Sequence, residues 1–248
     1  MEIEGKSVIV TGGARGIGLA CARELLERGA RVTIAASSES SIGEAVAQLG
    51  EREDLATVAS DLATVEGCRA VAQAALGAFG AIDVLFTNAG LYAEADVSET
   101  DEQLWDAVID TNLKSTFFCI QAALPELERA RGVIVTMSSF NGVTGIAGNV
   151  GVYGAAKAGV INLTRALALD LAPTVRVNCI APGFVETEKL LARENVEELT
   201  KIYSQITPLG RVARREEIAH ALVFAIENDF LTGTTLNIDG GRSAGEKH

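Results

Sequence analysis

Cationic side chains are scarce in this chain of 248 residues, which holds 21 Lys and Arg against 33 Asp and Glu. The formal net charge of −12 argues against nucleic acid or an anionic membrane as a partner, because both are bound through basic surfaces. No apolar run reaches the roughly 20 residues that cross a bilayer, and Met1–Glu4 lacks the basic and apolar parts of a secretory signal. We therefore expect a cytoplasmic protein that contacts neither nucleic acid nor membrane.

Paired cysteines are also lacking. Cys21, Cys68, Cys119 and Cys179 stand far apart, with no CxxC pair and no neighbouring histidine. The sequence therefore supports neither a disulfide framework nor a metal site, and we predict no metal. Isolated thiols of this kind are compatible with a reducing cytoplasm.

Short β-branched runs alternate with longer helical patterns along the chain. The expected strands are Ser7–Val10, Val32–Ala35, Ala56–Ala59, Val84–Thr87, Val133–Met137, Val175–Ala181 and Thr234–Ile238. The expected helices are Gly18–Arg28, Ser41–Gly50, Val65–Phe79, Asp101–Arg129 and Tyr153–Leu171. This alternation predicts an α/β fold, a doubly wound sheet of about seven mostly parallel strands with helices on both faces. No linker or repeat divides the chain, so we interpret residues 1–248 as one domain.

One stretch departs from this alternation of strands and helices. Residues 186–215 lie between the sixth and seventh expected strands and mix charged residues with leucine, isoleucine and tyrosine. An insertion of this length at the carboxyl edge of a parallel sheet typically covers a ligand. We predict a substrate-covering segment here, with an ordinary crossover helix as the alternative.

A glycine-rich turn, Thr11–Gly18, follows the first strand and opens the first helix. Glycines let the backbone turn sharply there, and the free N–H groups of the helix N-terminus attract a pyrophosphate. The turn therefore predicts a bound dinucleotide.

The end of the second strand bears on the choice of cofactor. An NAD-selective site places an acidic residue there to hold the ribose hydroxyls, but this chain has Ala36, Ser37 and Ser38. With no carboxylate to repel a 2′-phosphate, and with Arg15 available as a cation, we predict NADP(H), with NAD(H) as the alternative. A solvent-facing Arg15 is the competing interpretation.

Tyr153 and Lys157 lie four residues apart, which places both side chains on one face of a helix. A nearby ammonium stabilises a phenolate, and we expect it to lower the pKa of the tyrosine toward the range useful for acid–base catalysis. Ser138 and Ser139 end the fifth strand, where a hydroxyl can bond a substrate carbonyl. Asn112 lies inside an expected helix, a locally unfavourable place that suggests a task for its amide. The alternatives are that the tyrosine and lysine are an ordinary pair on a helix surface, that the two serines only cap the loop that follows, and that the asparagine is a surface amide.

Together these residues resemble the short-chain dehydrogenase/reductase family, in the branch with TGxxxGxG and YxxxK motifs, from end to end. The resemblance rests on Thr11-Gly12-x3-Gly16-x-Gly18, Asp61, Asn88-Ala89-Gly90, Asn112, Ser139, Tyr153-x3-Lys157, Pro182-Gly183-x3-Thr187 and Asp239-Gly240-Gly241. It implies a Rossmann-type fold, an NAD(P)-dependent oxidoreductase that interconverts a secondary alcohol and a ketone, and a homotetramer packed through the helix at Tyr153–Leu171.

The resemblance also implies a role for each catalytic residue. Tyr153 is the general acid or base, and Lys157 lowers its pKa and holds the nicotinamide ribose. Asn112 helps to relay the proton, and Ser139, rather than Ser138, orients the substrate. The complete set of predicted cofactor-binding residues is Gly12, Arg15, Gly16, Ile17, Gly18, Ser37, Ser38, Asp61, Leu62, Asn88, Ala89, Gly90, Tyr153, Lys157, Pro182, Gly183, Val185 and Thr187.

The resemblance implies a small-molecule carbonyl or alcohol as the substrate, and the sequence leaves its identity open. The residues expected to line its pocket are Tyr92, Phe140, Asn149, Val150, Phe184, Leu190, Leu191 and Tyr203. The first alternative is a 3-oxoacyl-(acyl-carrier-protein) reductase, whose acidic partner this acidic chain would repel unless Lys114, Arg129 and Arg131 form a basic patch. A catalytically silent nucleotide-binding sensor is the second, and the intact catalytic set argues against it. Only three residues separate Tyr153 from Lys157, fewer than in enoyl reductases of the wider family, so double-bond reduction is not expected.

Overall fold

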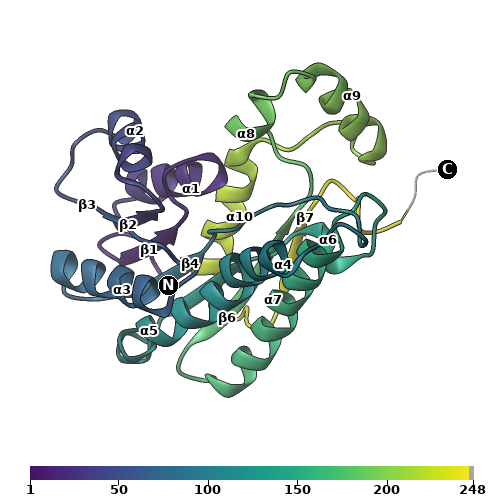
Figure 1. The fold of residues 1–248 in the computed structure, drawn as a ribbon. Coiled ribbons are helices and arrows are strands. Elements are labelled where there is room, and N and C mark those ends of the chain that lie inside the picture. Colours follow the sequence, from purple (N-terminus) through teal and green to yellow (C-terminus); the bar gives the residue numbers. More distant parts are fainter. Residues whose placement is uncertain (246–248) are drawn as a thin grey trace.

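The computed structural model describes residues 1–245 apart from the side chain of Lys189. A parallel sheet of seven strands, in the order β3-β2-β1-β4-β5-β6-β7, forms its centre (Figure 1). The last three residues of the predicted domain lie outside the described part. The strands are β1 (Ser7–Thr11), β2 (Arg31–Ala36), β3 (Leu55–Ala59), β4 (Val84–Thr87), β5 (Val133–Met137), β6 (Arg176–Pro182) and β7 (Thr235–Ile238). Every neighbouring pair is parallel, and the predicted doubly wound sheet is confirmed.

The central strands consist of continuous apolar runs because both faces of the sheet are covered. Val8 and Val10 of β1 pack on one side of the sheet, whereas Ile9 packs on the other. All five residues of β1 are buried. This burial on both faces is what a parallel sheet between two helical layers requires.

Two layers of helices cover the sheet. The first contains α1 (Gly16–Glu27), α2 (Glu39–Leu49) and α10 (Arg215–Glu227), whose apolar residues join the same cluster as Val8. The second contains α3 (Val65–Phe79), α5 (Ser115–Ala130) and α7 (Gly151–Asp170). Helix α10 is not among the helices expected from the sequence. It follows the segment at residues 186–215 and completes the first layer.

The long helix expected over Asp101–Arg129 is not continuous. It divides into α4 (Glu102–Ile109), a π-helical turn η1 (Asp110–Lys114) and α5. At the end of η1 the N–H of Ser115 donates to the carbonyl of Asp110, five residues back. A π-helical turn accommodates one extra residue and changes the direction of the side chains within it, which moves Asn112 out of the ordinary helical register.

Three further helices lie beyond the carboxyl ends of the strands. They are α6 (Phe140–Val143), α8 (Glu188–Leu191) and α9 (Val196–Ile206). Figure 1 shows α8 and α9 projecting away from the two helical layers. No residue of α9 is fully buried, so α9 packs on the protein only loosely. These two helices and the return loop make up the segment predicted to cover the substrate.

Candidate functional site

The glycine turn between β1 and α1 is held in place by the segment after β4. The side-chain amide of Asn88 donates to the carbonyls of Thr11, at 2.9 Å, and Gly12, at 3.1 Å. Gly12 has a φ of +62°, and a Cβ there would lie 2.9 Å from the Cα of Ala89. Only glycine fits this position. The two backbone segments therefore approach closely and form one wall of a cavity.

That cavity has a volume of about 340 Å³ and lies at the carboxyl ends of β1, β2, β3 and β4. Its lining consists of Gly12, Ala14, Arg15, Ala35, Ala36, Ser37, Ser41, Ser60, Asp61, Leu62, Ala63, Asn88, Ala89, Gly90 and Thr111. Eight of the predicted cofactor-binding residues are among them, and these are Gly12, Arg15, Ser37, Asp61, Leu62, Asn88, Ala89 and Gly90. The structure thus brings together residues from four separate strand ends.

Other predicted cofactor residues lie elsewhere. Ser38 caps α2 by accepting from the N–H of Ser41, whereas Ser41, which was not predicted, lines the cavity. Gly16, Ile17, Gly18 and Pro182 line neither this cavity nor the substrate cavity described below, which contains Gly183, Val185, Thr187 and Tyr153. Thr111 was missed because it enters from η1, and the sequence shows no sign of the π-helical turn.

Asn112 and Lys157 meet below Gly90. Asn112 is completely buried, and its amide nitrogen donates to the carbonyls of Val108, at 2.8 Å, and Leu91, at 2.9 Å. Its oxygen Oδ1 is buried without a hydrogen-bond partner. The ammonium of Lys157 is also buried and donates to the carbonyl of Met137 at 2.9 Å. Both groups thus have fixed orientations.

The two serines after β5 have different environments. The hydroxyl of Ser138 is buried and donates to the carbonyl of Lys157 at 2.8 Å. Ser139 instead lines a second cavity with Tyr153, and its hydroxyl accepts from the N–H of Asn141 at 3.3 Å. Only the Ser139 hydroxyl is therefore placed to meet a molecule in the cavity together with Tyr153.

Burial controls the ionisation of Tyr153 and Lys157. It raises the pKa of Tyr153 to about 12, although the hydrogen bond from Ser139 acts in the opposite direction. It lowers the pKa of Lys157 to about 8. The lysine was expected to lower the pKa of Tyr153, and the structure corrects this for the protein alone. Removal of the tyrosine from water outweighs a lysine whose ammonium is directed at Met137.

The second cavity, of about 230 Å³, opens beside Tyr153. Its lining consists of Tyr92, Ser139, Phe140, Asn141, Ile146, Tyr153, Gly183, Phe184, Val185, Thr187, Leu190, Arg193 and Tyr203. Of the residues predicted for the substrate pocket, Tyr92, Phe140, Phe184, Leu190 and Tyr203 are present. Asn149, Val150 and Leu191 do not line it, since Val150 is buried and Leu191 points outward with 48% of its surface exposed.

Five of the thirteen residues that line this cavity are aromatic. Tyr92 meets Tyr153 edge to face at 5.0 Å, and Phe184 lies 5.1 Å from Phe140. Phe184 also stacks on Tyr203 of α9 with ring centroids 4.0 Å apart, so this stack joins α9 to the body of the protein. Arg193, which was not predicted, is the one charged residue among the described lining residues.

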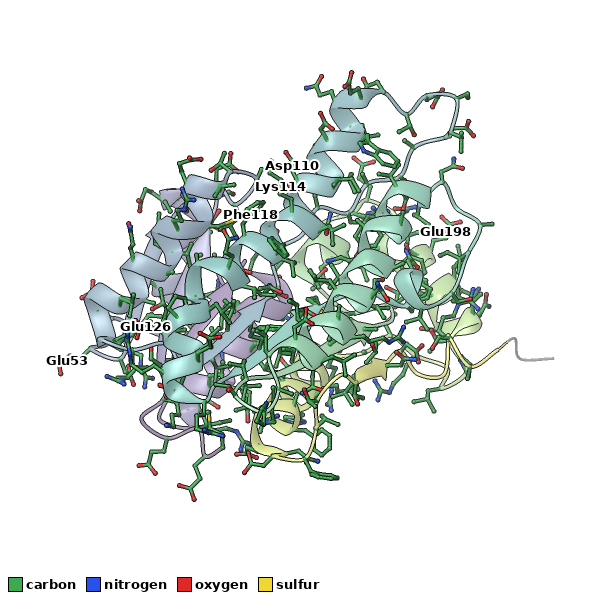
Figure 2. The ribbon with its side chains drawn as sticks, turned by 90° about the horizontal axis from the view of Figure 1, so that it is seen from below. Glu53, Asp110, Lys114, Phe118, Glu126 and Glu198 are labelled. Atoms are coloured by element: carbon green, nitrogen blue, oxygen red, sulfur yellow. The ribbon has the colours of Figure 1, made fainter. Side chains whose placement is uncertain are left out.

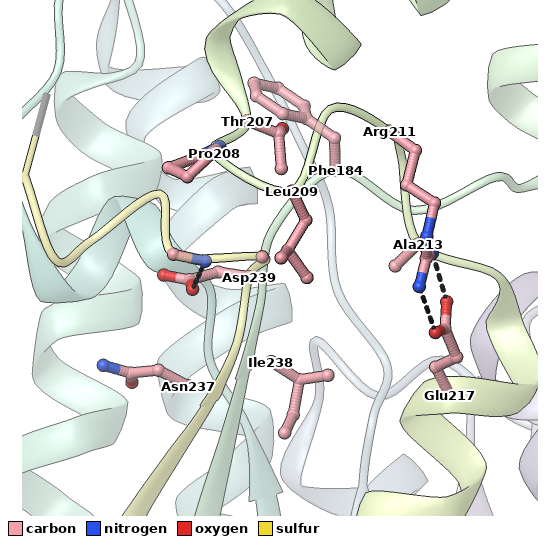
Figure 3. A pocket seen from close by; sticks show the side chains of 12 residues that line it. Phe184, Thr207, Pro208, Leu209, Arg211, Ala213, Glu217, Asn237, Ile238 and Asp239 are labelled. Carbon is pink, nitrogen blue, oxygen red and sulfur yellow. Dashed lines mark hydrogen bonds and ion pairs between the residues drawn. The ribbon is translucent and has the colours of Figure 1, made fainter. Parts of the chain in front are cut away.

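A third cavity, of about 470 Å³, is lined by Phe184, the return loop after α9 and the end of β7 (Figure 3). Arg211 and Glu217 form an ion pair at its edge, and the pKa of Glu217 falls to about 2 because it accepts hydrogen bonds from this guanidinium and from the backbone of Arg214. None of this arrangement is predictable from the sequence. The cavity contains none of the predicted catalytic residues.

The described residues contain no group of three His, Cys, Asp or Glu side chains able to hold a metal ion. Among residues 1–245 no helix is long and apolar enough to cross a membrane.

The residues present fit a nicotinamide dinucleotide. The first N–H groups of α1 follow a turn in which Gly16 has a φ of +58°, the environment that binds a pyrophosphate. The buried Oδ1 of Asn112 has no partner within the protein, as expected for an oxygen whose partner is a bound molecule or water. Polar side chains in the lining of the first cavity include those of Arg15, Ser37, Ser41 and Ser60.

Comparison with known proteins gives a consistent family. A family model described as enoyl-(acyl carrier protein) reductase matches residues 12–243. The chain is 38% identical over 245 residues to a 3-oxoacyl-(acyl-carrier-protein) reductase of Chlamydia muridarum, covering 95% of this chain and 96% of that protein.

Solved structures agree with this. An RhlG–NADP active-site complex of Pseudomonas aeruginosa is 32% identical, with a TM-score of 0.90 and 97% of each chain covered. The aldohexose dehydrogenase of Thermoplasma acidophilum is 28% identical, with a TM-score of 0.88, covering 98% of this chain and 96% of that chain.

Proposed function

Because this chain belongs to the short-chain dehydrogenase/reductase family, we propose that it is an NADPH-preferring reductase of a hydrophobic ketone bearing an acidic group. It is an NAD(P)-dependent oxidoreductase that interconverts a secondary alcohol and a ketone. The observation that carries the proposal is the cavity beside Tyr153, which is lined by five aromatic residues and one guanidinium.

The preference for NADPH rests on the residues that line the first cavity near the end of β2. Ala36 and Ser37 occupy the end of β2, where an acidic residue would repel a 2′-phosphate. Arg15 lines the same cavity, and its side chain forms no ion pair with the carboxylates of residues 1–245. A guanidinium free of a carboxylate partner is well suited to bind a phosphate.

When bound, the nicotinamide supplies or accepts a hydride. Tyr153 would donate a proton to the carbonyl oxygen in reduction and remove it in oxidation. Ser139 would hold that oxygen, since its hydroxyl shares the cavity with Tyr153. Lys157 and Asn112 would pass the proton toward solvent and hold the ribose next to Gly90, to which both are close. The spacing of three residues between Tyr153 and Lys157 favours carbonyl over double-bond reduction.

The substrate class follows from the lining of the second cavity. Its rings and Leu190 favour an apolar or aromatic body. Arg193 forms no ion pair within the part of the chain that the structure describes, and it would pair with a carboxylate or a similar anionic group on the substrate. Leu190, Arg193 and Tyr203 all come from residues 186–215, so this segment would cover the substrate as it binds.

We place the enzyme in the cytoplasm because its four cysteines are free and buried. We also propose a homotetramer. Apolar side chains are exposed on the outer helices, including Trp105 at 48%, Phe117 at 40% and Leu169 at 82%, and burial of such surface stabilises an interface.

A 3-oxoacyl-(acyl-carrier-protein) reductase is the second candidate, because relatives at 36–38% identity carry that name. The local charges do not favour it. Lys114 is paired with Asp110 at 2.9 Å, and Arg129 is paired with Glu126. Figure 2 shows Asp110, Lys114 and Phe118 in one row on the helix, with Glu126 further along. Two of the three cations that such a basic patch would need are thus paired with neighbouring carboxylates.

The test is a panel of ketones assayed with NADPH and NADH. It should contain aromatic and aliphatic ketones, each with and without a carboxylate, and a 3-oxoacyl group on an acyl carrier protein. We expect the highest kcat/KM for an acidic ketone with NADPH. A higher value for the carrier-bound substrate would favour the second candidate, and a higher value for neutral ketones would contradict the substrate class proposed here.

A further inference from the structure

A carboxylate of the protein already occupies the anion-binding end of α1. The N–H of Gly16, the first residue of that helix, donates to Oε2 of Glu188 at 2.8 Å. Glu188 opens α8 and lies 172 positions away in the chain. This N–H is part of the glycine turn that would receive the pyrophosphate of the cofactor. In the free protein, therefore, an internal anion takes the place of the external one.

The second oxygen of the same carboxylate is also engaged. Oε1 of Glu188 pairs with the guanidinium of Arg215 at the start of α10. Thr187 supports the geometry, because its hydroxyl accepts from the N–H of Leu190 and caps α8. A Cβ added at Gly16 would lie 3.7 Å from both Oε2 of Glu188 and the methyl of Thr187. The start of α8 therefore rests directly on the glycine turn.

A pyrophosphate and this carboxylate cannot both accept from the N–H of Gly16. Each is an anion drawn to the positive end of the helix dipole, and each repels the other at close range. Any molecule that carries a diphosphate must displace Glu188 before it can bind fully. The free energy needed to break the Glu188 contact then weakens the observed binding of the cofactor. The effect is the same as for any protein of which only a fraction is in the state that can bind.

We propose that Glu188 is an internal competitor of the cofactor pyrophosphate, and that its displacement releases the start of α8 when cofactor binds. Arg215 provides the alternative partner. Because Glu188 already contacts Arg215 through its other oxygen, rotation of the side chain away from Gly16 keeps the ion pair. The inference rests on the proposed function only in requiring that the turn bind a nicotinamide dinucleotide.

A purely structural role for Glu188 makes the opposite prediction. If the contact only holds α8 in a productive position, its loss should loosen the segment and weaken cofactor binding. If Glu188 competes with pyrophosphate, its loss should strengthen binding. The direction of the change in Kd therefore separates the two roles.

The experiment measures Kd by titration calorimetry for three probes, NADPH, ADP and adenosine 2′-phosphate. The variants are E188Q, which removes the charge, E188A, which removes the contact, and E194Q. Glu194 is an exposed carboxylate on the same segment, so E194Q changes the net charge equally without touching the turn.

We expect E188Q and E188A to bind NADPH and ADP about fivefold more tightly than the native protein. Adenosine 2′-phosphate lacks a diphosphate, so its Kd should not change. E194Q should match the native protein with all three. Unchanged or weaker binding of ADP by E188Q would overturn the inference. Absence of NADPH binding in the native protein would instead refute the cofactor assignment, so the two failures are distinguishable.

Hydrogen exchange provides a readout that is independent of affinity. In the free native protein, Glu188 should protect the amide of Gly16, and E188A should remove this protection. Saturating NADPH should then protect the glycine turn and increase exchange in residues 188–193. If NADPH protected both segments together, Glu188 would not have been displaced.

Discussion

The ammonium of Lys157 and the amide oxygen of Asn112 converge on Gly90. A Cβ placed on this glycine would lie 3.3 Å from Nζ of the lysine and 2.7 Å from Oδ1 of the asparagine. Gly90 is thus required by the closeness of two polar side chains rather than by an unusual backbone angle. The segment after β4 therefore limits the space in which these two groups can act.

Gly90→Ala should consequently damage the site. The methyl group would separate Lys157 from Asn112, and we expect kcat to fall by about 100-fold, the scale of a misplaced catalytic group. Gly77→Ala is the matched control, because Gly77 lies inside α3 and a Cβ added to it would have no atom within 4 Å. That change should raise stability by about 0.5–1 kcal/mol. Equal activity of the two variants in steady-state assays would contradict the argument.

Tyr153→Phe should remove the proton donor while keeping the ring that packs against Tyr92. Loss of a general acid or base reduces turnover by about 100-fold to 10,000-fold, whereas the Kd for NADPH should change little. Tyr203→Phe is the control within the same cavity and should retain most activity, because its stacking on Phe184 is preserved. Substantial turnover by the Tyr153 variant would exclude the proposed mechanism.

Lys157→Met should alter how stability depends on pH. Burial lowers the pKa of Lys157 from 10.5 to about 8, so between these values the unfolded chain binds more protons than the folded protein. In that window the lysine makes the free energy of unfolding rise with pH, and its destabilising effect is largest below pH 8, where it amounts to about 3 kcal/mol.

The variant should lack this rise between pH 8 and 10. Below pH 8 it should be the more stable protein, by less than the full amount, because the carbonyl of Met137 loses its donor. Above pH 10, Tyr153 contributes the opposite slope, since burial raises its pKa to about 12. Urea denaturation at pH 7, 8, 9 and 10 measures the difference, and parallel curves would show that Lys157 is not buried as a cation.

Arg15→Ala tests the cofactor preference. Loss of a guanidinium that contacts a 2′-phosphate should raise the Kd of NADPH by about tenfold, the effect of one charge-assisted pair, and leave that of NADH unchanged. Arg23→Ala, on the outer part of α1, is the control and should affect neither. If the variant still preferred NADPH, Ser37 and Ser41 rather than Arg15 would determine the selectivity.

Arg193→Gln tests the substrate class. We expect KM for a carboxylated aromatic ketone to rise by about tenfold, and KM for the matching neutral ketone to stay the same. The paired substrates control for any general disturbance of α8 and α9, which would affect both. An equal rise for the two ketones would show that Arg193 supports the segment instead of binding the substrate.

The strands and the glycine turn were predictable because their causes are local. Runs such as Val133–Met137 consist of residues that suit a sheet buried on both faces, and the turn has glycines where the backbone needs them. Most cavity residues could be predicted for the same reason, since the carboxyl ends of parallel strands share one edge of the sheet.

The contacts that were missed depend on distant parts of the chain. Nothing near Glu188 in the sequence indicates that it reaches Gly16, and the ionisation of Tyr153 depends on its burial rather than on its spacing from Lys157. Arg193 was overlooked because only the folded position of α8 brings it to the cavity. Ser41 replaced Ser38 in the lining because Ser38 is used to cap α2.

The π-helical turn at Asp110–Lys114 makes the site insensitive to substitutions in the flanking helices but sensitive to a deletion within the turn. Exposed residues of the helices on either side can change freely, because they affect neither the length nor the register of the turn. Deleting one residue within it would restore a regular helix and rotate Asn112 by about 100° about the helix axis, given 3.6 residues per turn. The packing of α4 and α5 could be preserved after that change, while the side-chain amide of Asn112 would no longer lie near Lys157. A single codon lost there would thus separate a folded protein from a working one.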